Sequence, residues 1–290
     1  MDLNLYDKVV CITGGSRGIG YATALAFARE GAKVLICARD AARLDEAVER
    51  IRSATGVSID AVQTDVTKVE DIERLGQHVE SAYGRLDILV NNAGTGIYKP
   101  FASVTSQDLM EGMAVNFFAQ FRVTQRMLDL LAKAGNSVVI NVSGRSGTRG
   151  VFPPGSSCTG PAKAAEVRFS MDLASELAEL GIRVNCVVPG VVESDDRFKL
   201  WEGQALNRSL DAAAADAVRR DLEKTSVPQG QRWGQPFEIA DVITFLASPR
   251  AAYVNGAALT VDGGSHNKSY VTQLYAERPA VMEKLGKSSA

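Results

Sequence analysis

The chain has 290 residues, of which 46% are hydrophobic, and its 32 basic and 34 acidic residues leave a net charge of -2 at pH 7. This is the composition of an ordinary globular chain with enough apolar mass for a large core. The near balance of charge gives no electrostatic reason to expect nucleic acid or an anionic membrane as a partner.

No apolar run approaches the ~18 residues of a membrane span, and residues 1–8 lack the basic-then-apolar pattern of a secretory signal. The cysteines form no Cys-x-x-Cys pair, so we interpret Cys11, Cys37 and Cys186 as small buried hydrophobes within strands. The two histidines, His78 and His266, are far apart and indicate no zinc site. We therefore expect a cytoplasmic protein in a reducing compartment.

Short apolar runs alternate with segments of helical periodicity, which predicts a parallel sheet wrapped by helices. The expected strands, in chain order, are Val9–Ile12, Lys33–Ala38, Ser58–Thr64, Leu86–Val90, Ser137–Val142, Ile182–Val188 and Ala257–Val261. The expected helices are Ile19–Glu30, Ala41–Ala54, Val69–Tyr83, one or two within Ser106–Ala134, and one from about Pro161 to Leu180. Because crossovers between parallel strands are right-handed, we expect an α/β fold: a single doubly wound Rossmann domain of about seven parallel strands with helices on both faces.

Two segments fall outside this rhythm. We expect a nucleotide-binding domain over residues 1–264, with the charged, alanine-rich insert 195–230 as a substrate lid and 265–290 as a C-terminal extension. The extension is expected to cover the pocket or to reach a neighbouring subunit. Aromatic and proline residues suggest an apolar pocket wall, although plain packing is the alternative: Phe101, Phe152, Pro153, Phe198 and Trp201. The extension's candidate contacts are Tyr270, Leu274 and Tyr275.

A glycine-rich segment, Thr13-Gly14-Gly15-Ser16-Arg17-Gly18-Ile19-Gly20, lies between the first expected strand and the first expected helix. Glycines let a backbone approach phosphate closely, and the free N–H groups at a helix start bind anionic oxygens. At a strand-to-helix turn in a repeated β-α pattern, such a segment indicates a nucleotide cofactor.

The glycine spacing, with Asn91-Asn92-Ala93-Gly94, Asn116, Lys163 and Pro189-Gly190, resembles the short-chain dehydrogenase/reductase family over about residues 5–264. The resemblance implies a cofactor, NAD or NADP, contacted by residues of the glycine loop, the adenine and ribose segments, and the nicotinamide segment. These residues are Gly14, Ser16, Arg17, Gly18, Ile19, Gly20, Asp65, Val66, Asn92, Ala93, Gly94, Lys163, Pro189, Gly190, Val192 and Ser194.

The end of the second strand distinguishes the two cofactors. An acidic residue there accepts from the ribose 2′-hydroxyl of NAD, whereas an arginine favours the 2′-phosphate of NADP. Arg39 occupies this place and Arg17 can reinforce it through guanidinium–phosphate pairing. We favour NADP; Asp40 keeps NAD as the alternative, and two solvated arginines would be the neutral interpretation.

In the family, an asparagine, a serine, a tyrosine and a lysine are catalytic, and the tyrosine exchanges the proton with the carbonyl oxygen. Asn116 and Lys163 match two of these positions. Gly144 stands where the serine is expected and Thr159 where the tyrosine is expected. Ser143 is adjacent to Gly144, but the alternation of a strand directs it to the opposite face. A threonine hydroxyl is far less acidic than a phenol, so the usual proton transfer is predicted to be impaired.

Several substitutes could supply the proton: Lys163 itself, a water held by Thr159, Ser157, Glu193 or Asp195. The resemblance implies an NADP-dependent oxidoreductase that interconverts a secondary alcohol and a ketone, here with an altered or inactivated proton-transfer site. The alternatives are a non-redox NADP-binding or regulatory protein, and a lyase or isomerase that uses the cofactor structurally. We expect a homodimer or homotetramer, in which Phe117, Phe118, Phe121 and Val123 form an interface or simply core.

Overall fold

The computed structural model describes residues 2–149, 155–193 and 232–267. The chain divides into two compact units, the first formed by 1–189 and 236–260 and the second by 190–235 and 261–290. Within the described residues, no helix is both long and apolar enough to cross a membrane.

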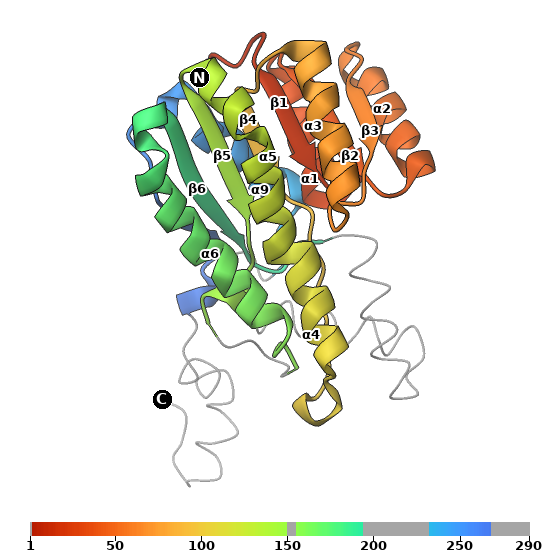
Figure 1. The fold of residues 1–290 in the computed structure, drawn as a ribbon, viewed down its shortest axis with the longest axis vertical. Coiled ribbons are helices and arrows are strands. Elements are labelled where there is room, and N and C mark those ends of the chain that lie inside the picture. Colours follow the sequence, from red (N-terminus) through yellow and green to blue (C-terminus); the bar gives the residue numbers. More distant parts are fainter. Residues whose placement is uncertain (1, 150–154, 194–231, 268–290) are drawn as a thin grey trace, which may run out of the picture. The chain divides into compact units, whose positions relative to one another are not determined.

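The first unit is built on a seven-stranded sheet, as predicted (Figure 1). Its strands are β1 Val9–Thr13, β2 Lys33–Ala38, β3 Asp60–Gln63, β4 Ile88–Asn91, β5 Ser137–Val142, β6 Ile182–Pro189 and β7 Ala258–Val261. The order across the sheet is β3-β2-β1-β4-β5-β6-β7, and the five strand pairs from β3 to β6 are parallel. The order reverses between β1 and β4, and open α/β sheets bind ligands at such a switch point, beyond the carboxyl ends of the strands.

Helices cover both faces of the sheet. They are α1 Gly18–Arg29, α2 Ala41–Thr55, α3 Val69–Tyr83, α4 Ser106–Met113, α5 Ala119–Ala134, α6 Thr159–Glu176 and α9 Pro236–Ala247. Short 3-10 turns are η1 Phe101–Ser103, η3 Arg145–Gly147, η4 Ala178–Leu180, η5 Pro249–Ala251 and η6 Ser265–Asn267. Helices α1 and α9 pack on one another, and α3 packs on α5; in Figure 1, α5 and α6 lie in front of the sheet. The Rossmann prediction is confirmed.

The core lies between the sheet and its helices. Every residue of β1, β4 and β5 is buried, which explains why these strands show continuous apolar runs rather than alternation. Cys11, Cys37 and Cys186 are buried in strands, as predicted, and Cys158 is buried as well. At the candidate interface, Val123 is core, Phe117 and Phe118 are half-buried, and Phe121 is 43% exposed.

Two helices differ from the sequence prediction. Helix α6 begins at Thr159 rather than near Pro161, because proline is tolerated within a first helical turn, where its missing N–H has no partner to lose. The expected helical stretch 106–134 is interrupted by a π-helical turn, η2 Ala114–Phe118, which contains Asn116. Such turns are rare and frequently mark functional sites.

Part of the sequence prediction lies outside the described residues. This applies to the proposed lid 195–230, to most of the C-terminal extension 265–290, and to individual candidates. Those candidates are Phe152, Pro153, Ser194, Asp195, Phe198, Trp201, Tyr270, Leu274 and Tyr275.

Candidate active site

The glycine loop connects β1 to α1 and is folded so tightly that side chains would collide. Gly14 has a φ of +66°, in the left-handed region, and a Cβ on Gly20 would lie 2.2 Å from the carbonyl oxygen of Gly14. The side chain of Arg17, the N-cap residue of α1, does not cap the helix, and the first turn contains no acidic residue. The amide groups at this helix start can therefore bind an anion, as a cofactor phosphate requires.

The segment after β4 is fastened to the end of β1. The backbone N–H groups of Asn92 and Ala93 both donate to Thr13 Oγ1, each at 3.0 Å. The side-chain amide of Asn92 donates to the carbonyl oxygens of Thr13 and Gly14, at 3.0 and 3.1 Å. These bonds bring together Asn92, Ala93 and the glycine loop, all of which the family resemblance implied as cofactor contacts. The side chain of Asn92 therefore holds the segment after β4 against the glycine loop.

Three arginines gather beside the glycine loop. The pKa of the Arg17 guanidinium is lowered, because the group is partly buried and because Arg43 and Arg39 repel its charge. Asp40 partly offsets this repulsion. Its carboxylate also accepts from the Arg43 amide at 3.1 Å, as the N-cap of α2, and lies 3.4 Å from the Arg43 side chain. Cations in excess at one place favour a bound anion.

Arg39 and Asp65 line one hollow of about 320 Å³, with Gln63, Lys68, Asp71 and Arg74 as its other lining residues. Asp65 uses one carboxylate oxygen locally, accepting from the Thr67 amide at 3.0 Å and the Thr67 hydroxyl at 2.7 Å. The side chain of Val66 is 6% exposed and belongs to the hydrophobic core, so any cofactor contact at Val66 would use its backbone.

Asn116 and Lys163 meet at Gly94. A Cβ on Gly94 would lie 2.8 Å from Asn116 Oδ1 and 3.1 Å from Lys163 Nζ. Asn116 is fully buried and held on both sides: its amide donates to Gly112 O at 2.7 Å and Thr95 O at 3.0 Å, and its oxygen accepts from the Thr95 amide at 3.2 Å. Two residues predicted to be catalytic are therefore brought together beside an exposed glycine.

Gly144 faces the same lysine. The nearest atom to a Cβ placed on Gly144 is Lys163 Cδ, at 4.0 Å, so this position has room for a side chain directed at Lys163. Its φ of -178° is extended backbone that any residue adopts. The neighbouring Ser143 is not a ready substitute, because its hydroxyl donates to the carbonyl oxygen of Lys163 at 2.8 Å.

The Thr159 hydroxyl is fully used by the backbone of one residue. Thr159 Oγ1 accepts from the Ile97 amide at 2.8 Å and donates to the Ile97 carbonyl at 2.9 Å, and the residue is 2% exposed. A hydroxyl has one proton to give, and this one is committed to Ile97. Thr159 therefore anchors the segment that follows Gly94 to the start of α6. Ser157, another candidate donor, lies exposed just before that helix.

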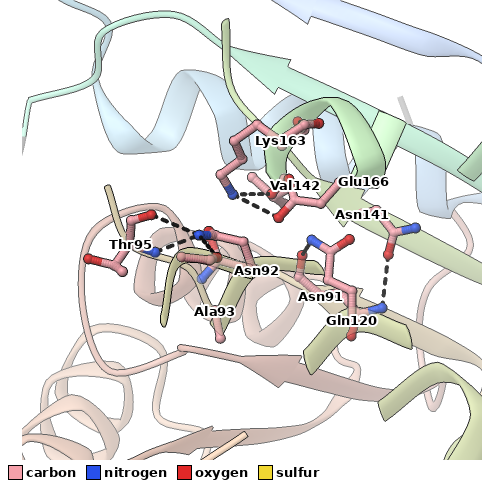
Figure 2. Close-up of polar contacts among 12 residues, drawn as sticks. Asn91, Asn92, Ala93, Thr95, Gln120, Asn141, Val142, Lys163 and Glu166 are labelled. Atoms are coloured by element: carbon pink, nitrogen blue, oxygen red, sulfur yellow. Dashed lines mark hydrogen bonds and ion pairs between the residues drawn. The ribbon is translucent and has the colours of Figure 1, made fainter. Parts of the chain in front are cut away.

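One buried group at this place escaped the sequence analysis. Figure 2 shows the ammonium of Lys163 directed at the Glu166 carboxyl and the Val142 carbonyl, at 3.0 and 3.4 Å. Glu166 is 0% exposed and lies one turn along α6, on the helix face that packs into the protein. Desolvation by burial raises the pKa of Glu166, and Lys163 and, to a smaller extent, Ser143 oppose that rise. The sequence spacing could have indicated this pair, because Glu166 follows Lys163 by three residues and therefore lies on the same face of the helix.

The nicotinamide-segment candidates divide between the two units. Pro189 is buried at the end of β6 in the first unit. In the second unit, the Gly190 amide donates to Val261 O at 2.9 Å, and Val192 forms a parallel bridge with Gly234. Glu193, a candidate acid, accepts from the side-chain amide of Gln235.

A switch-point sheet with a tight glycine loop, an uncapped helix start and a conjunction of asparagine and lysine defines a Rossmann-type nucleotide-binding protein. The sequence profile described as "short chain dehydrogenase" matches residues 8–205. The chain belongs to the short-chain dehydrogenase family.

Individual relatives support this assignment. The chain is 34% identical over 262 residues to the 3-oxoacyl-(acyl-carrier-protein) reductase FabG of Thermotoga maritima, covering 90% of this chain and 99% of the relative. It is 34% identical over 263 residues to a tropinone reductase homolog of Arabidopsis thaliana, covering 90% and 91%. Among solved structures, L-sorbose reductase of Gluconobacter frateurii, complexed with NADPH and L-sorbose, matches with a TM-score of 0.86 and 30% identity, over 93% of this chain and all of that one.

Proposed function

We propose that this chain is an NADP-dependent oxidoreductase that interconverts a secondary alcohol and a ketone, with a proton-transfer site that does not use the family's tyrosine. The observation that carries the proposal is the meeting of Asn116 and Lys163 at Gly94, while the Thr159 hydroxyl is committed to Ile97. These two observations support a site that binds the cofactor and carries a structural hydroxyl at the position where the family has its phenol.

NADP fits the residues at the cofactor end. A Cβ placed on Gly18 would have no atom within 4 Å, so the loop leaves open space at this point, and the start of α1 supplies amide donors for a phosphate. Arg39 and Arg17 would hold a 2′-phosphate, while one oxygen of Asp40 already accepts the helix-cap hydrogen bond from the Arg43 amide. The sorbose reductase complex with NADPH supports the same choice.

NADPH, when bound, supplies the hydride. The chain's part is to hold the cofactor, orient the carbonyl and deliver one proton to its oxygen. Lys163 Nζ lies 3.1 Å from a Cβ placed on the exposed Gly94, so we assign the delivery of that proton to Lys163. Asn116 keeps the Thr95 backbone in place through two hydrogen bonds and is itself held by a third, to the Gly112 carbonyl oxygen.

A second candidate function is a non-redox NADP-binding or regulatory protein, and the double commitment of Thr159 favours it. Position 144 has no hydroxyl and the hydroxyl of Thr159 is committed to Ile97, so the family's general acid is lost. Such a loss lowers the rate by roughly 10²–10⁴. Such a loss could leave binding without useful turnover.

The double variant Gly144→Ser with Thr159→Tyr distinguishes the two functions. The space around Gly144 accommodates serine, while tyrosine at 159 gives up the contact with Ile97, so NADPH binding must be measured alongside activity. The oxidoreductase proposal predicts NADPH-dependent turnover of a ketone and alcohol panel by the wild-type chain, and faster turnover by the double variant. If both proteins bind NADPH and neither turns over any member of the panel, the oxidoreductase proposal is wrong and the regulatory one is favoured.

A homodimer or homotetramer is part of the proposal. Phe121 on α5 and Met171 on α6 are each 43% exposed, and Phe169 packs on Phe121 with ring centroids 5.6 Å apart. Exposed apolar side chains that gather on two helices are typical of a subunit contact. Light scattering of the Phe121→Glu variant tests it: a monomer supports this contact, and an unchanged oligomer contradicts it.

A further inference from the structure

Helix α6 buries a stripe of polar side chains instead of an apolar one. The residues that face inward along it are Thr159, Ala162, Lys163, Glu166, Ser170 and Ala174. Buried charged groups are costly unless paired, so a glutamate on this stripe requires a reason. Its place, one turn beyond the lysine of the candidate site, points to a link with that lysine.

Glu166 contacts the candidate site through Lys163. Its Oε1 accepts from Lys163 Nζ at 3.0 Å, and the carboxyl itself is 0% exposed. The lysine side chain, in contrast, keeps 11% of its surface exposed and reaches Gly94. The Lys163 ammonium therefore lies between the Glu166 carboxyl and the side of the site that faces solvent and substrate.

The surroundings of the second carboxyl oxygen of Glu166, Oε2, favour the protonated form of this carboxyl. Among the residues that the structure describes, Oε2 of Glu166 has no hydrogen-bond partner, although Ser143 lies beside the carboxyl. The Ser143 proton is given to the Lys163 carbonyl, so only its lone pairs are left for Glu166. An ionised oxygen buried without a donor is unfavourable, whereas a protonated one can donate to those lone pairs.

Few other titratable groups face this carboxyl in the described part of the chain. Lys163 comes from its own helix, and Cys186 comes from β6. Burial raises the pKa of the Cys186 thiol to about 12, so the thiol stays neutral over the working range. Ser143 from the end of β5 and Ser170 from α6 are the uncharged neighbours. Among the described residues that face Glu166, Lys163 is thus the charged group whose protonation is coupled to that of Glu166.

We propose that Glu166 is a positioning residue that stores the proton for the reduction and passes it to Lys163, in place of the tyrosine-based route. This inference rests on the proposed function and deepens it. In the reduction, the carbonyl carbon accepts the hydride, an N–H bond of the Lys163 ammonium breaks and an O–H bond forms on the product. The proton of the Glu166 carboxyl then moves to Nζ, leaving a carboxylate–ammonium pair. One proton from water, entering by way of the lysine, restores the starting state.

The first test needs no turnover. Isotope-edited infrared spectra of the chain labelled with ¹³C-glutamate report a protonated carboxyl through its C=O stretch. We expect such a band at pH 7 in wild-type protein, its loss in Glu166→Gln, and its persistence in the matched control Glu176→Gln, which changes an exposed glutamate of the same helix. Absence of a band that Glu166→Gln removes overturns the inference, whatever the activity.

The second test separates proton transfer from binding. We expect Glu166→Gln to lower kcat by roughly 10², with NADPH affinity within about twofold of wild type if the change stays local to proton transfer. The wild-type kcat for reduction should fall as pH rises through the titration of Glu166, and Glu166→Gln should lose that limb. If the Glu166→Gln variant has the same kcat and the same pH profile as the wild-type protein, the inference is wrong. If Glu166→Gln does not fold, Glu166→Asp replaces it, with a shifted infrared band and a lowered kcat expected. Absence of wild-type turnover despite the carboxyl band refutes the proposed function instead.

Discussion

Replacing Thr159 by valine removes one hydroxyl and almost no volume. The hydroxyl makes two hydrogen bonds, 2.8 and 2.9 Å long, to the amide and carbonyl of Ile97, and it is 2% exposed. Each intramolecular hydrogen bond contributes about 0.5–1.5 kcal/mol, and an unsatisfied buried group costs ~1–3 kcal/mol. Ile97 is half-buried, so water can partly replace the lost partner. We therefore expect a loss of about 2 kcal/mol in the free energy of unfolding.

For a chain of this size, about 2 kcal/mol corresponds to a fall in Tm of roughly 4–8 °C. Calorimetry of Thr159→Val measures it, and Thr159→Ser, which keeps the hydroxyl, serves as the matched control with a smaller fall. Hydrogen exchange at the Ile97 amide gives a local readout and should accelerate in Thr159→Val alone. An unchanged Tm together with unchanged exchange at Ile97 would refute the structural role assigned to this hydroxyl.

Two further predictions concern the cofactor and acid pH. Arg39→Ser should weaken NADPH binding by roughly 10–100-fold, since a charge-assisted hydrogen bond contributes about 1.5–3 kcal/mol. Binding of NADH, which lacks the 2′-phosphate, should be nearly unchanged. Equal weakening of both cofactors in calorimetric titrations would contradict the assignment of Arg39 to the 2′-phosphate. Lys99 and the Thr105 amide hold the pKa of Asp108 at about 2, below its usual 3.8. Its stabilising contribution is therefore complete above pH 3.8 and lost as pH falls toward 2, so Asp108→Asn should flatten that part of the urea-midpoint profile, and the exposed-site control Asp129→Asn should not.

The fold and the meeting of the site segments were predictable from the sequence. The glycine loop and Asn92 follow the ends of two expected parallel strands, and such ends share one edge of a sheet. Lys163 lies near the start of the helix that precedes the sixth expected strand. Their convergence depends on the repeated β-α rhythm rather than on any single residue. The register of β1 on β4, with Ile12 opposite Val90, then brings the segments into hydrogen-bonding contact.

The role of Thr159 could not be predicted in the same way. Its partner, Ile97, is 62 residues away in the chain and offers only backbone atoms, which carry no sequence signal. The occupation of Asp40 as a helix cap is the opposite case, because an aspartate just before a helix is a recognised N-cap pattern. Glu166 was missed because a charged residue on a helix is usually assigned to the solvent face.

Deuteride transfer tests the central proposal most directly. Wild-type protein incubated with NADPH deuterated at the transferred position and a ketone panel should yield a secondary alcohol carrying deuterium on its carbinol carbon, detected by mass spectrometry. The label should be strongly reduced in Lys163→Met, because that lysine is assigned the proton delivery. Tight NADPH binding by the wild-type chain with no labelled alcohol from any ketone would contradict the proposal that this site performs a redox reaction.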